Sequence, residues 1–258
     1  NSARMIEKEL NVSYRAIQRY LHKLGIRVRN RSKGLKLAIK EGRLKVPPAK
    51  QHKIPKNSNK LTEEKAYILG ALCGDGWLSL TKRSSYQIGL SVTDEDFADK
   101  FSISLKKVYN LDPKKSLKRR VKEHWKDQFL IRLCSKQVYQ DLKRYHKNFK
   151  TFEWKVPKEI VNSTQQVKSK FLQGFFDSEG YVDSNKRNKR IGCTSANIKG
   201  LTGINDILKE FNIYSKIKER NGENIKDICI GDWQSIKNFH KMIGFSIKRK
   251  RENLKRLV

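Results

Sequence analysis

The chain has 258 residues, and 58 Lys and Arg against 26 Asp and Glu give it a formal net charge of +32. Hydrophobic residues make up 37% of it and aromatic residues 9%, too many core-forming side chains for a disordered polycation. Such a charge favours nucleic acid, an anionic membrane or an acidic protein as partner, and no run approaches the roughly 18 apolar residues of a membrane span. Nucleic acid is therefore the expected partner.

Two features of the sequence bear on where the protein works. Residues 1–10 have mixed charge and do not resemble a secretory signal. The four cysteines are far apart and form no Cys-x-x-Cys pair, which predicts no zinc site and fits a reducing compartment. We expect a protein that is not secreted and that works with nucleic acid in the cytoplasm or in an organelle matrix.

Residues 1–26 predict two short helices joined by a tight turn. Ser13 suits the N-cap of the second helix, and Gly25 suits its C-terminal end. This pattern resembles a helix-turn-helix segment, although an ordinary helical hairpin remains the alternative. Side chains of the second helix that suit base edges and phosphates are Tyr14, Arg15, Gln18 and Arg19.

The segment 27–60 predicts a basic linker. Residues 1–60 hold 17 Lys and Arg against 3 acids, and the linker carries three prolines with little apolar periodicity. Such a segment can follow a phosphate backbone. The alternative is a tail that only improves solubility.

An internal repeat begins after the linker. Residues 66–76, AYILGALCGDG, are echoed 104 positions later by residues 170–180, KFLQGFFDSEG. Each segment predicts an apolar helix, and each is followed by two strands, a helix, two strands and a helix. These elements are predicted at 77–82, 86–92, 95–109, 115–122, 128–134 and 136–147, and again at 181–186, 190–195, 197–211, 214–220, 225–230 and 233–243. Two domains of about 100 residues, 61–160 and 161–258, follow from this repeat.

Small residues line one face of each repeated helix. Gly70 and Gly74 are four apart in the first helix, as are Gly174 and Ser178 in the second. Two such flat strips predict that the helices pack at or below the usual axis separation of about 8–10 Å. Ser163, with a Gln three residues later, is the predicted N-cap of the second helix.

An acid stands at the end of each repeated helix. Asp75 and Glu179 precede Gly76 and Gly180, which can adopt a left-handed helix cap. Each carboxylate opposes the negative end of its helix at a cost of roughly 0.3–1 kcal/mol, and the two would repel each other if the helices lie parallel. A divalent cation between them removes both penalties, and Mg²⁺ favours one or two carboxylates with water and phosphate oxygens. We interpret the pair as a metal site for phosphodiester hydrolysis, against the alternative of two unrelated helix-ending acids.

The paired segments resemble the motifs of the LAGLIDADG homing endonucleases, in the single-chain form that carries both copies. The resemblance covers residues 61–258. It implies an α+β fold in which an αββαββα unit is repeated about a pseudo-twofold axis. The motif helices would form the domain interface, and two saddle-shaped antiparallel sheets would straddle the major groove of double-stranded DNA. A monomer is expected, because one chain supplies both halves.

The same resemblance implies a Mg²⁺-dependent DNA endonuclease that makes double-strand breaks with short 3′ overhangs at a long recognition site. Its metal ligands would be Asp75 and Glu179, with the backbone carbonyls of Gly74 and Ser178. Members of the family also carry a basic residue just before the terminal helix. Its counterparts here are Lys248 in the second copy and Lys155 in the first, for which a phosphate contact or a solvated charge is the alternative.

The chain departs from the family pattern at the end of the second strand of each copy, where many members carry Gln or Lys and this chain has Val-Thr-Asp at 92–94 and Cys-Thr-Ser at 193–195, so the water network near the metal must differ. A second departure lies two residues before one of the acids. Two residues before the acid, where Asp is frequent, the chain has Cys73 in the first copy and Asp177 in the second. This residue usually packs or caps and does not catalyse, so the departure leaves the proposed chemistry intact.

Sequence would be read by alternate side chains of the sheets, because only one face of each strand meets DNA. The predicted DNA-binding residues are Ser79, Thr81, Arg83, Gln87, Arg119 and Lys122 in the first copy, and Asp183, Asn185, Arg187, Arg190, Lys216 and Lys218 in the second.

Two other functions fit the same resemblance. A DNA-binding regulator or an RNA maturase can keep the fold without cutting, although the presence of both acids favours the enzyme. An endonuclease within an intron or intein is the other possibility. The chain has no Cys or Ser at residue 1 and no His-Asn pair at its end, so we expect no self-splicing by this chain.

Overall fold

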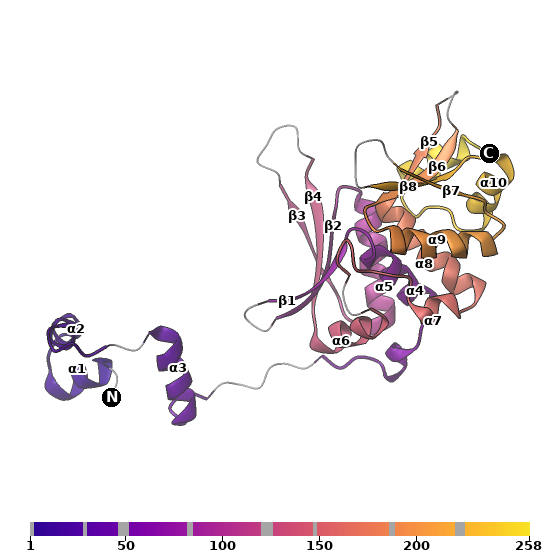
Figure 1. The fold of residues 1–258 in the computed structure, drawn as a ribbon. Coiled ribbons are helices and arrows are strands. Elements are labelled where there is room, and N and C mark those ends of the chain that lie inside the picture. Colours follow the sequence, from indigo (N-terminus) through magenta and orange to yellow (C-terminus); the bar gives the residue numbers. More distant parts are fainter. Residues whose placement is uncertain are drawn as a thin grey trace. The chain divides into compact units, whose positions relative to one another are not determined.

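The computed structural model describes residues 3–27, 30–45, 52–81, 85–119, 126–146, 149–185, 189–219 and 225–258. It divides into two compact units, Asn1–Lys50 and Gln51–Val258 (Figure 1). Among the described residues, no helix is both long enough and apolar enough to cross a membrane.

The first unit contains the two predicted helices and a third. Helix α1 (Ala3–Leu10) and helix α2 (Tyr14–Lys23) are joined by a short turn. The side chain of Ser13 accepts a hydrogen bond from the Ala16 amide, and Gly25 has a φ of +66°, as predicted. Helix α3 (Arg31–Lys40) lies inside the segment predicted as a linker. Its N-cap is Asn30, whose side chain accepts a hydrogen bond from the Lys33 amide. The prediction of a linker relied on apolar periodicity, which does not register such a cap.

The second unit contains two four-stranded antiparallel sheets with the same strand order. The first sheet has the order β1-β2-β4-β3 and the second β5-β6-β8-β7. The strands are β1 (Gly76–Leu80), β2 (Tyr86–Val92), β3 (Lys114–Lys118), β4 (Gln128–Cys134), β5 (Gly180–Asp183), β6 (Arg190–Ser195), β7 (Lys216–Glu219) and β8 (Lys226–Ile230). The predicted α+β fold with two repeats is confirmed.

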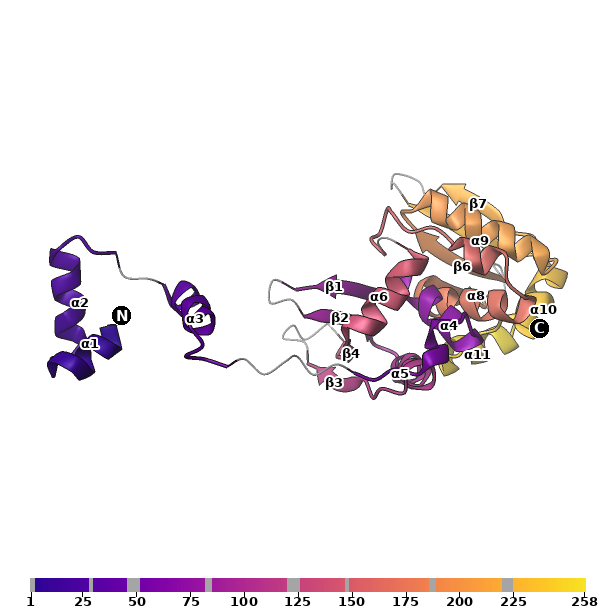
Figure 2. The same cartoon turned by 90° about the horizontal axis from the view of Figure 1, so that it is seen from below.

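The helices of the second unit repeat in the same way. Their bounds are α4 (Glu63–Leu72), α5 (Glu95–Tyr109), α6 (Lys136–Tyr145) and α7 (Lys158–Val161), then α8 (Gln165–Glu179), α9 (Ile198–Glu210), α10 (Trp233–Met242) and α11 (Lys248–Lys255). The motif helices α4 and α8 lie side by side between the two sheets (Figures 1 and 2).

Each sheet has one face against helices. On β2, Ile88 and Leu90 are fully buried, while their neighbour Gln87 is half-buried on the other face. On β8 of the second sheet, Ile228 and Ile230 are likewise fully buried. The period-two burial therefore assigns one face of each sheet to the core and leaves the opposite face for other contacts.

Backbone contact joins the two motif helices. A Cβ atom added to Gly70 would lie 2.0 Å from the Phe171 carbonyl oxygen, and one added to Gly174 would lie 2.2 Å from the Tyr67 carbonyl oxygen. The predicted close approach is thus confirmed. Gly70 faces the middle of α8 and Gly74 faces its end, so the helices run parallel and their C-terminal ends lie together.

One predicted N-cap and two predicted left-handed caps are wrong. The N-cap of α8 is Thr164, whose hydroxyl accepts from the Val167 amide, while Ser163 instead donates to the Ile160 carbonyl. Gly76 and Gly180 begin strands and do not adopt the left-handed conformation. Glycine is needed at 180 for a steric reason, because a Cβ there would lie 2.4 Å from the Phe176 carbonyl oxygen.

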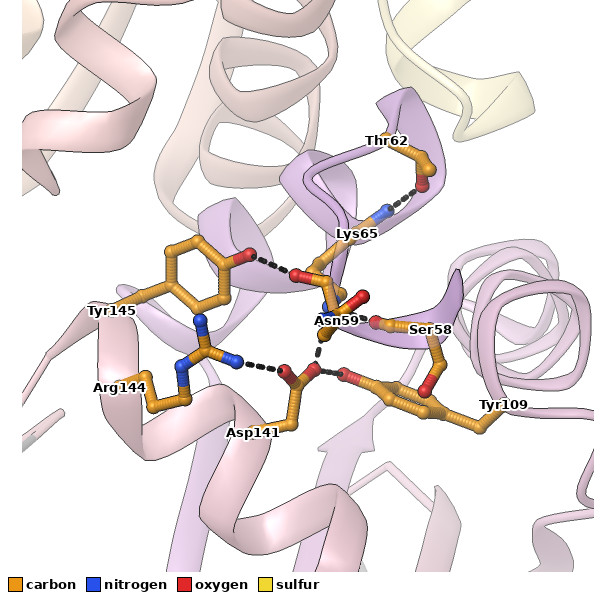
Figure 3. Close-up of polar contacts among 8 residues, drawn as sticks. All are labelled: Ser58, Asn59, Thr62, Lys65, Tyr109, Asp141, Arg144 and Tyr145. Carbon is orange, nitrogen blue, oxygen red and sulfur yellow. Dashed lines mark hydrogen bonds and ion pairs between the residues drawn. The ribbon is translucent and has the colours of Figure 1, made fainter. Parts of the chain in front are cut away.

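A buried ion pair fastens the chain that leads into α4 (Figure 3). The Lys65 ammonium is fully buried, lies 2.6 Å from Asp141 Oδ2 on α6, and also donates to the Ser58 carbonyl in the 3₁₀ helix η1 (Lys56–Asn59). Tyr109 donates to the same carboxylate at 2.8 Å. Burial lowers the pKa of Lys65, and the bond to Asp141 opposes that shift. Residues 56–59 therefore belong structurally to the second unit.

The close contact of Gly70 with α8 predicts how the interface between α4 and α8 responds to a larger side chain. Gly70→Ala should lower the free energy of unfolding by about 1–3 kcal/mol or more, because neither backbone can move away without displacing its sheet. Urea unfolding followed by circular dichroism measures the decrease. Gly231→Ala is the matched control, since a Cβ there meets nothing within 4 Å. Equal unfolding free energies for the two variants would contradict the close contact.

Candidate active site

The C-terminal ends of α4 and α8 bring two acids to one place. Glu179 is the last residue of α8, and Asp75 lies in the turn between α4 and β1. A Cβ added to Gly74 would lie 2.4 Å from the Ser178 Cβ and 3.1 Å from Glu179 Oε1. The Glu179 carboxylate therefore lies against the backbone next to Asp75, so the two predicted acids meet.

The electrostatics of the two acids agree with that proximity. Burial raises the pKa of Glu179 to about 7, and the negative charge of Asp75 is the second cause. Burial also raises the pKa of Asp75. The side chain of Asp75 as a whole is exposed to solvent, but protein atoms surround much of its carboxyl group. The repulsion expected from parallel helices is thus present in the folded chain.

A buried lysine, Lys250, offsets part of this repulsion. It lies on α11, and its ammonium donates to the Phe176 carbonyl at 3.1 Å and to the Asp177 carbonyl at 2.6 Å, at the end of α8. Its charge lowers the pKa of both Asp75 and Glu179, while burial lowers its own pKa. The ammonium therefore counters the helix dipole and the two acids together.

Sequence reasoning missed Lys250, although a signal for it exists. The stretch 248–251 reads Lys-Arg-Lys-Arg, so the lysines cannot be told apart by type. However, Ile247, Leu254 and Leu257 are buried, and with Lys250 they follow helical spacing on one face. That apolar stripe could have identified the one lysine of the run that points inward.

The structure does not bring the two predicted lysines to the acids. Lys248 is exposed, its amide donates to Asp96 Oδ2 at 2.5 Å, and its ammonium lies 4.0 Å from Glu252 Oε1. Lys155 is exposed, and its amide donates to His146 Nε2 at 3.1 Å. Neither charge contributes to the pKa shifts of the acids, unlike that of Lys250.

The positions two before each acid are structural. Asp177 is buried and accepts hydrogen bonds from the Tyr67 hydroxyl at 2.7 Å and from the Ser246 amide at 3.0 Å. It thereby ties α4 and the segment before α11 to α8. Cys73 is buried at the corresponding position of the first repeat. Both placements agree with the packing role expected from the sequence.

The predicted DNA-binding residues of the sheets fall into four groups. Ser79 pairs with Gln87 across β1 and β2 on the face away from the helices, and Asp183 pairs with Arg190 across β5 and β6. Thr81, Arg119 and Asn185 follow the ends of β1, β3 and β5, whereas Lys216 and Lys218 are exposed on β7. Arg83, Lys122 and Arg187 lie outside the described residues.

The predicted residues of the first unit lie on α2. Tyr14, Arg15 and Arg19 are exposed, while Gln18 is half-buried and donates to the Tyr14 hydroxyl at 2.8 Å. The Tyr14 amide donates to Glu7 Oε1 on α1 at 2.9 Å, which fixes the start of α2. Two arginines on one short exposed helix suit contact with phosphates.

The donor set at the helix ends fits a hard divalent cation. Asp75 and Glu179 offer carboxylate oxygens, and the carbonyls of Gly74 and Ser178 lie in the same turns. No group of three or more His, Cys, Asp or Glu side chains suited to a metal occurs in the described part of the chain. Two carboxylates that leave room for water and phosphate oxygens are the arrangement that Mg²⁺ uses with nucleic acid substrates.

The raised pKa of Glu179 predicts a pH-dependent stability. In a chelator at pH 8, Glu179→Gln should be more stable than the original chain by about 1–3 kcal/mol, since partial exposure reduces the full value of the shift. The cost of the charge is absent below pH 4.5, grows between pH 4.5 and about 7, and is complete above pH 7.

Urea unfolding across this range measures the difference, with Glu252→Gln, an exposed acid on α11, as control. Millimolar Mg²⁺ should reduce the difference in unfolding free energy between Glu179→Gln and the original chain at pH 8. A Glu179→Gln chain that is less stable than the original at every pH would contradict the repulsion.

Comparisons with known proteins agree with this geometry. Residues 166–244 match the LAGLIDADG-like domain, and residues 64–126 match the WhiA LAGLIDADG-like domain. An uncharacterized protein of Methanocaldococcus jannaschii is 30% identical over 212 residues, which are 76% of this chain and 71% of that protein.

Two solved structures show the same fold. The structure of I-DmoI in complex with DNA and Mn has a TM-score of 0.53 at 16% identity, over 71% of this chain and 98% of that one. The homing endonuclease I-WcaI bound to its DNA recognition sequence has a TM-score of 0.54 at 16% identity, over 82% of this chain and 97% of that one. With two such domains in one polypeptide and its motif helices in backbone contact, the chain belongs to the LAGLIDADG family.

Proposed function

We propose that the protein is a site-specific homing endonuclease that hydrolyses one phosphodiester bond in each strand of double-stranded DNA, with Mg²⁺ as its cation. The observation that carries the proposal is the meeting of Asp75 and Glu179 at two parallel helix ends. Each acid opposes its helix dipole and the other acid, which makes this an unfavourable place for two carboxylates in a fold selected for stability alone. A site that binds a cation and phosphate oxygens accounts for both.

The residues have separable roles in this mechanism. Asp75 and Glu179 would hold the cation, with the carbonyls of Gly74 and Ser178 as further ligands. When bound, the cation supplies an activated water and neutralises charge that develops on the phosphate. Lys250 is a positioning residue, because it holds the last turn of α8 and favours the ionised form of both acids. Its ammonium is occupied by carbonyls, so it is not free to contact substrate.

The DNA would lie along the faces of the sheets turned away from the helices. On these faces Ser79 and Gln87 suit base edges, and the high net charge suits the phosphate backbone. In this arrangement residues 61–160 and 161–258 act as the two halves of the enzyme and residues 1–26 as an additional DNA contact. The basic segment 27–60, which contains α3 and whose residues 56–59 belong to the second unit, connects them. The similar I-WcaI and I-DmoI structures, which contain DNA, support this placement.

A regulator or RNA maturase that binds without cutting is the alternative. It needs the basic surfaces but has no use for two acids that meet. Cleavage therefore separates the two functions, whereas binding does not.

Substitution of either acid tests the proposed chemistry. Asp75→Asn and Glu179→Gln should each slow cleavage about 100-fold or more, because each removes a cation ligand, and DNA affinity should change little. The target is first obtained by incubating randomised or source-genome DNA with Mg²⁺ or with a chelator and sequencing the ends. Asp206→Asn, an exposed acid on α9, is the control. Full cleavage by both site variants would refute the metal site.

A truncated chain tests the first unit. Residues 51–258 alone should bind DNA more weakly, because fewer phosphates are neutralised. The plot of log affinity against log salt should be less steep, by about 0.9 for each phosphate that residues 1–50 neutralise in the full chain. The chain is cut at the boundary between the two units, so that it keeps Ser58, whose carbonyl accepts a hydrogen bond from Lys65 in the second unit. An unchanged salt slope would mean that residues 1–50 do not touch DNA.

A further inference from the structure

A cavity of about 820 Å³ lies at one end of the second sheet. It is lined by residues around the start of β6, the start of β7 and the end of β8. Gly180, next to the acid Glu179, pairs with Cys193 at one end of the β5–β6 ladder, whereas Arg190 is at the other end. The cavity therefore lies away from the acids, and its volume is in the range of ligand pockets.

Positive charge dominates the lining. Lys189, Arg190, Lys216 and Lys218 all line the cavity, against one acid, Asp232. Within the described part of the chain, the three lysines form no ion pair. The carboxylate of Asp232 caps α10 by accepting from the Ser235 amide at 3.0 Å. The cations are thus largely uncompensated, which suits an anionic ligand.

One donor in this lining has no acceptor. Arg190 Nε is buried and makes no hydrogen bond in the described structure. The Arg190 side chain is 41% exposed and forms an ion pair with Asp183, whose Oδ2 atom lies 3.7 Å from Nε, too far for a hydrogen bond. The guanidinium also lies 5.7 Å from the centre of the Tyr181 ring, which restricts its orientation. The partly exposed guanidinium can therefore present its terminal N–H groups to an acceptor that enters the cavity.

We propose that this cavity binds a phosphate group of the DNA backbone. Lysine acts as a point charge toward phosphate, and Lys216 and Lys218 lie two residues apart on β7, on one face of the sheet. Tyr214, which is 71% exposed, borders the cavity and offers an apolar surface to the adjoining sugar. The two lysines and Arg190 are then a clamp that positions the duplex, not readers of base sequence.

The proposal rests on the DNA binding of the proposed function but not on cleavage. Binding is therefore measured in a chelator, with the full chain, on a target duplex and on an unrelated duplex over a series of salt concentrations. Lys216→Gln with Lys218→Gln should weaken binding to both duplexes by the same factor, about tenfold, and lower the salt slope by about 1. Lys237→Gln with Lys241→Gln, which removes the same charge from the exposed side of α10, should leave the slope nearly unchanged.

Three outcomes would overturn the proposal. Equal slope changes for the two pairs of substitutions would show only an effect of net charge. If the Lys216/Lys218 variant no longer distinguishes one base pair of the target from its alternatives but binds the unrelated duplex normally, the lysines read bases. Inorganic phosphate or a nucleoside monophosphate that binds the original chain but not the Lys216/Lys218 variant, with DNA affinity unchanged, would make the cavity a site for a free ligand.

Discussion

The backbone contact between α4 and α8 is the constraint on which the rest of the structure depends. With a glycine from each helix against a carbonyl of the other, the helices lie parallel and their C-terminal ends coincide. The two sheets follow these helices directly, so one contact determines both the separation of the sheets and the meeting of the acids. A larger residue at Gly70 or Gly174 would separate the acids as well as weaken the fold.

The repeated fold surrounds a site that is not symmetric. Pro157 precedes α7 and Ile247 precedes α11, and the third residue after each is buried. It is Ile160 in the first repeat and Lys250 in the second, so a single buried ammonium serves both acids. The phosphate clamp proposed at β6 to β8 is built from residues of the second repeat. The two halves therefore share a framework and differ in their polar contacts with each other and with DNA.

Most of the fold could be predicted from the sequence because the repeat shows each element twice. The predicted helix 95–109 and the strands 86–92, 128–134 and 190–195 have the bounds seen in the structure, since apolar periodicity of 2 or 3.6 determines them. The acids could be identified for a related reason, as their helix-end positions recur 104 residues apart.

What could not be predicted depends on contacts between distant segments. Gly180 is required by a helix carbonyl oxygen, and Gly76 lies tightly against Leu72 and the Ala71 carbonyl. Neither glycine is in a left-handed turn, and composition does not reveal these contacts. Lys250 is distinguished from its basic neighbours only by the face of a short helix. The Nε atom of Arg190 has no hydrogen-bond acceptor because of how β5 and β6 pair, and the sequence does not show this pairing geometry.

The central claim is that two acids from separate repeats form one cation site on bound DNA. Crystals of the full chain with its cleaved or uncleaved target and Mn²⁺ test it directly, because anomalous scattering locates the metal. The account predicts anomalous density in contact with the carboxylates of both Asp75 and Glu179, next to phosphate oxygens. The absence of anomalous density next to both carboxylates, or a metal that contacts only one acid at a site remote from the other acid, would contradict it.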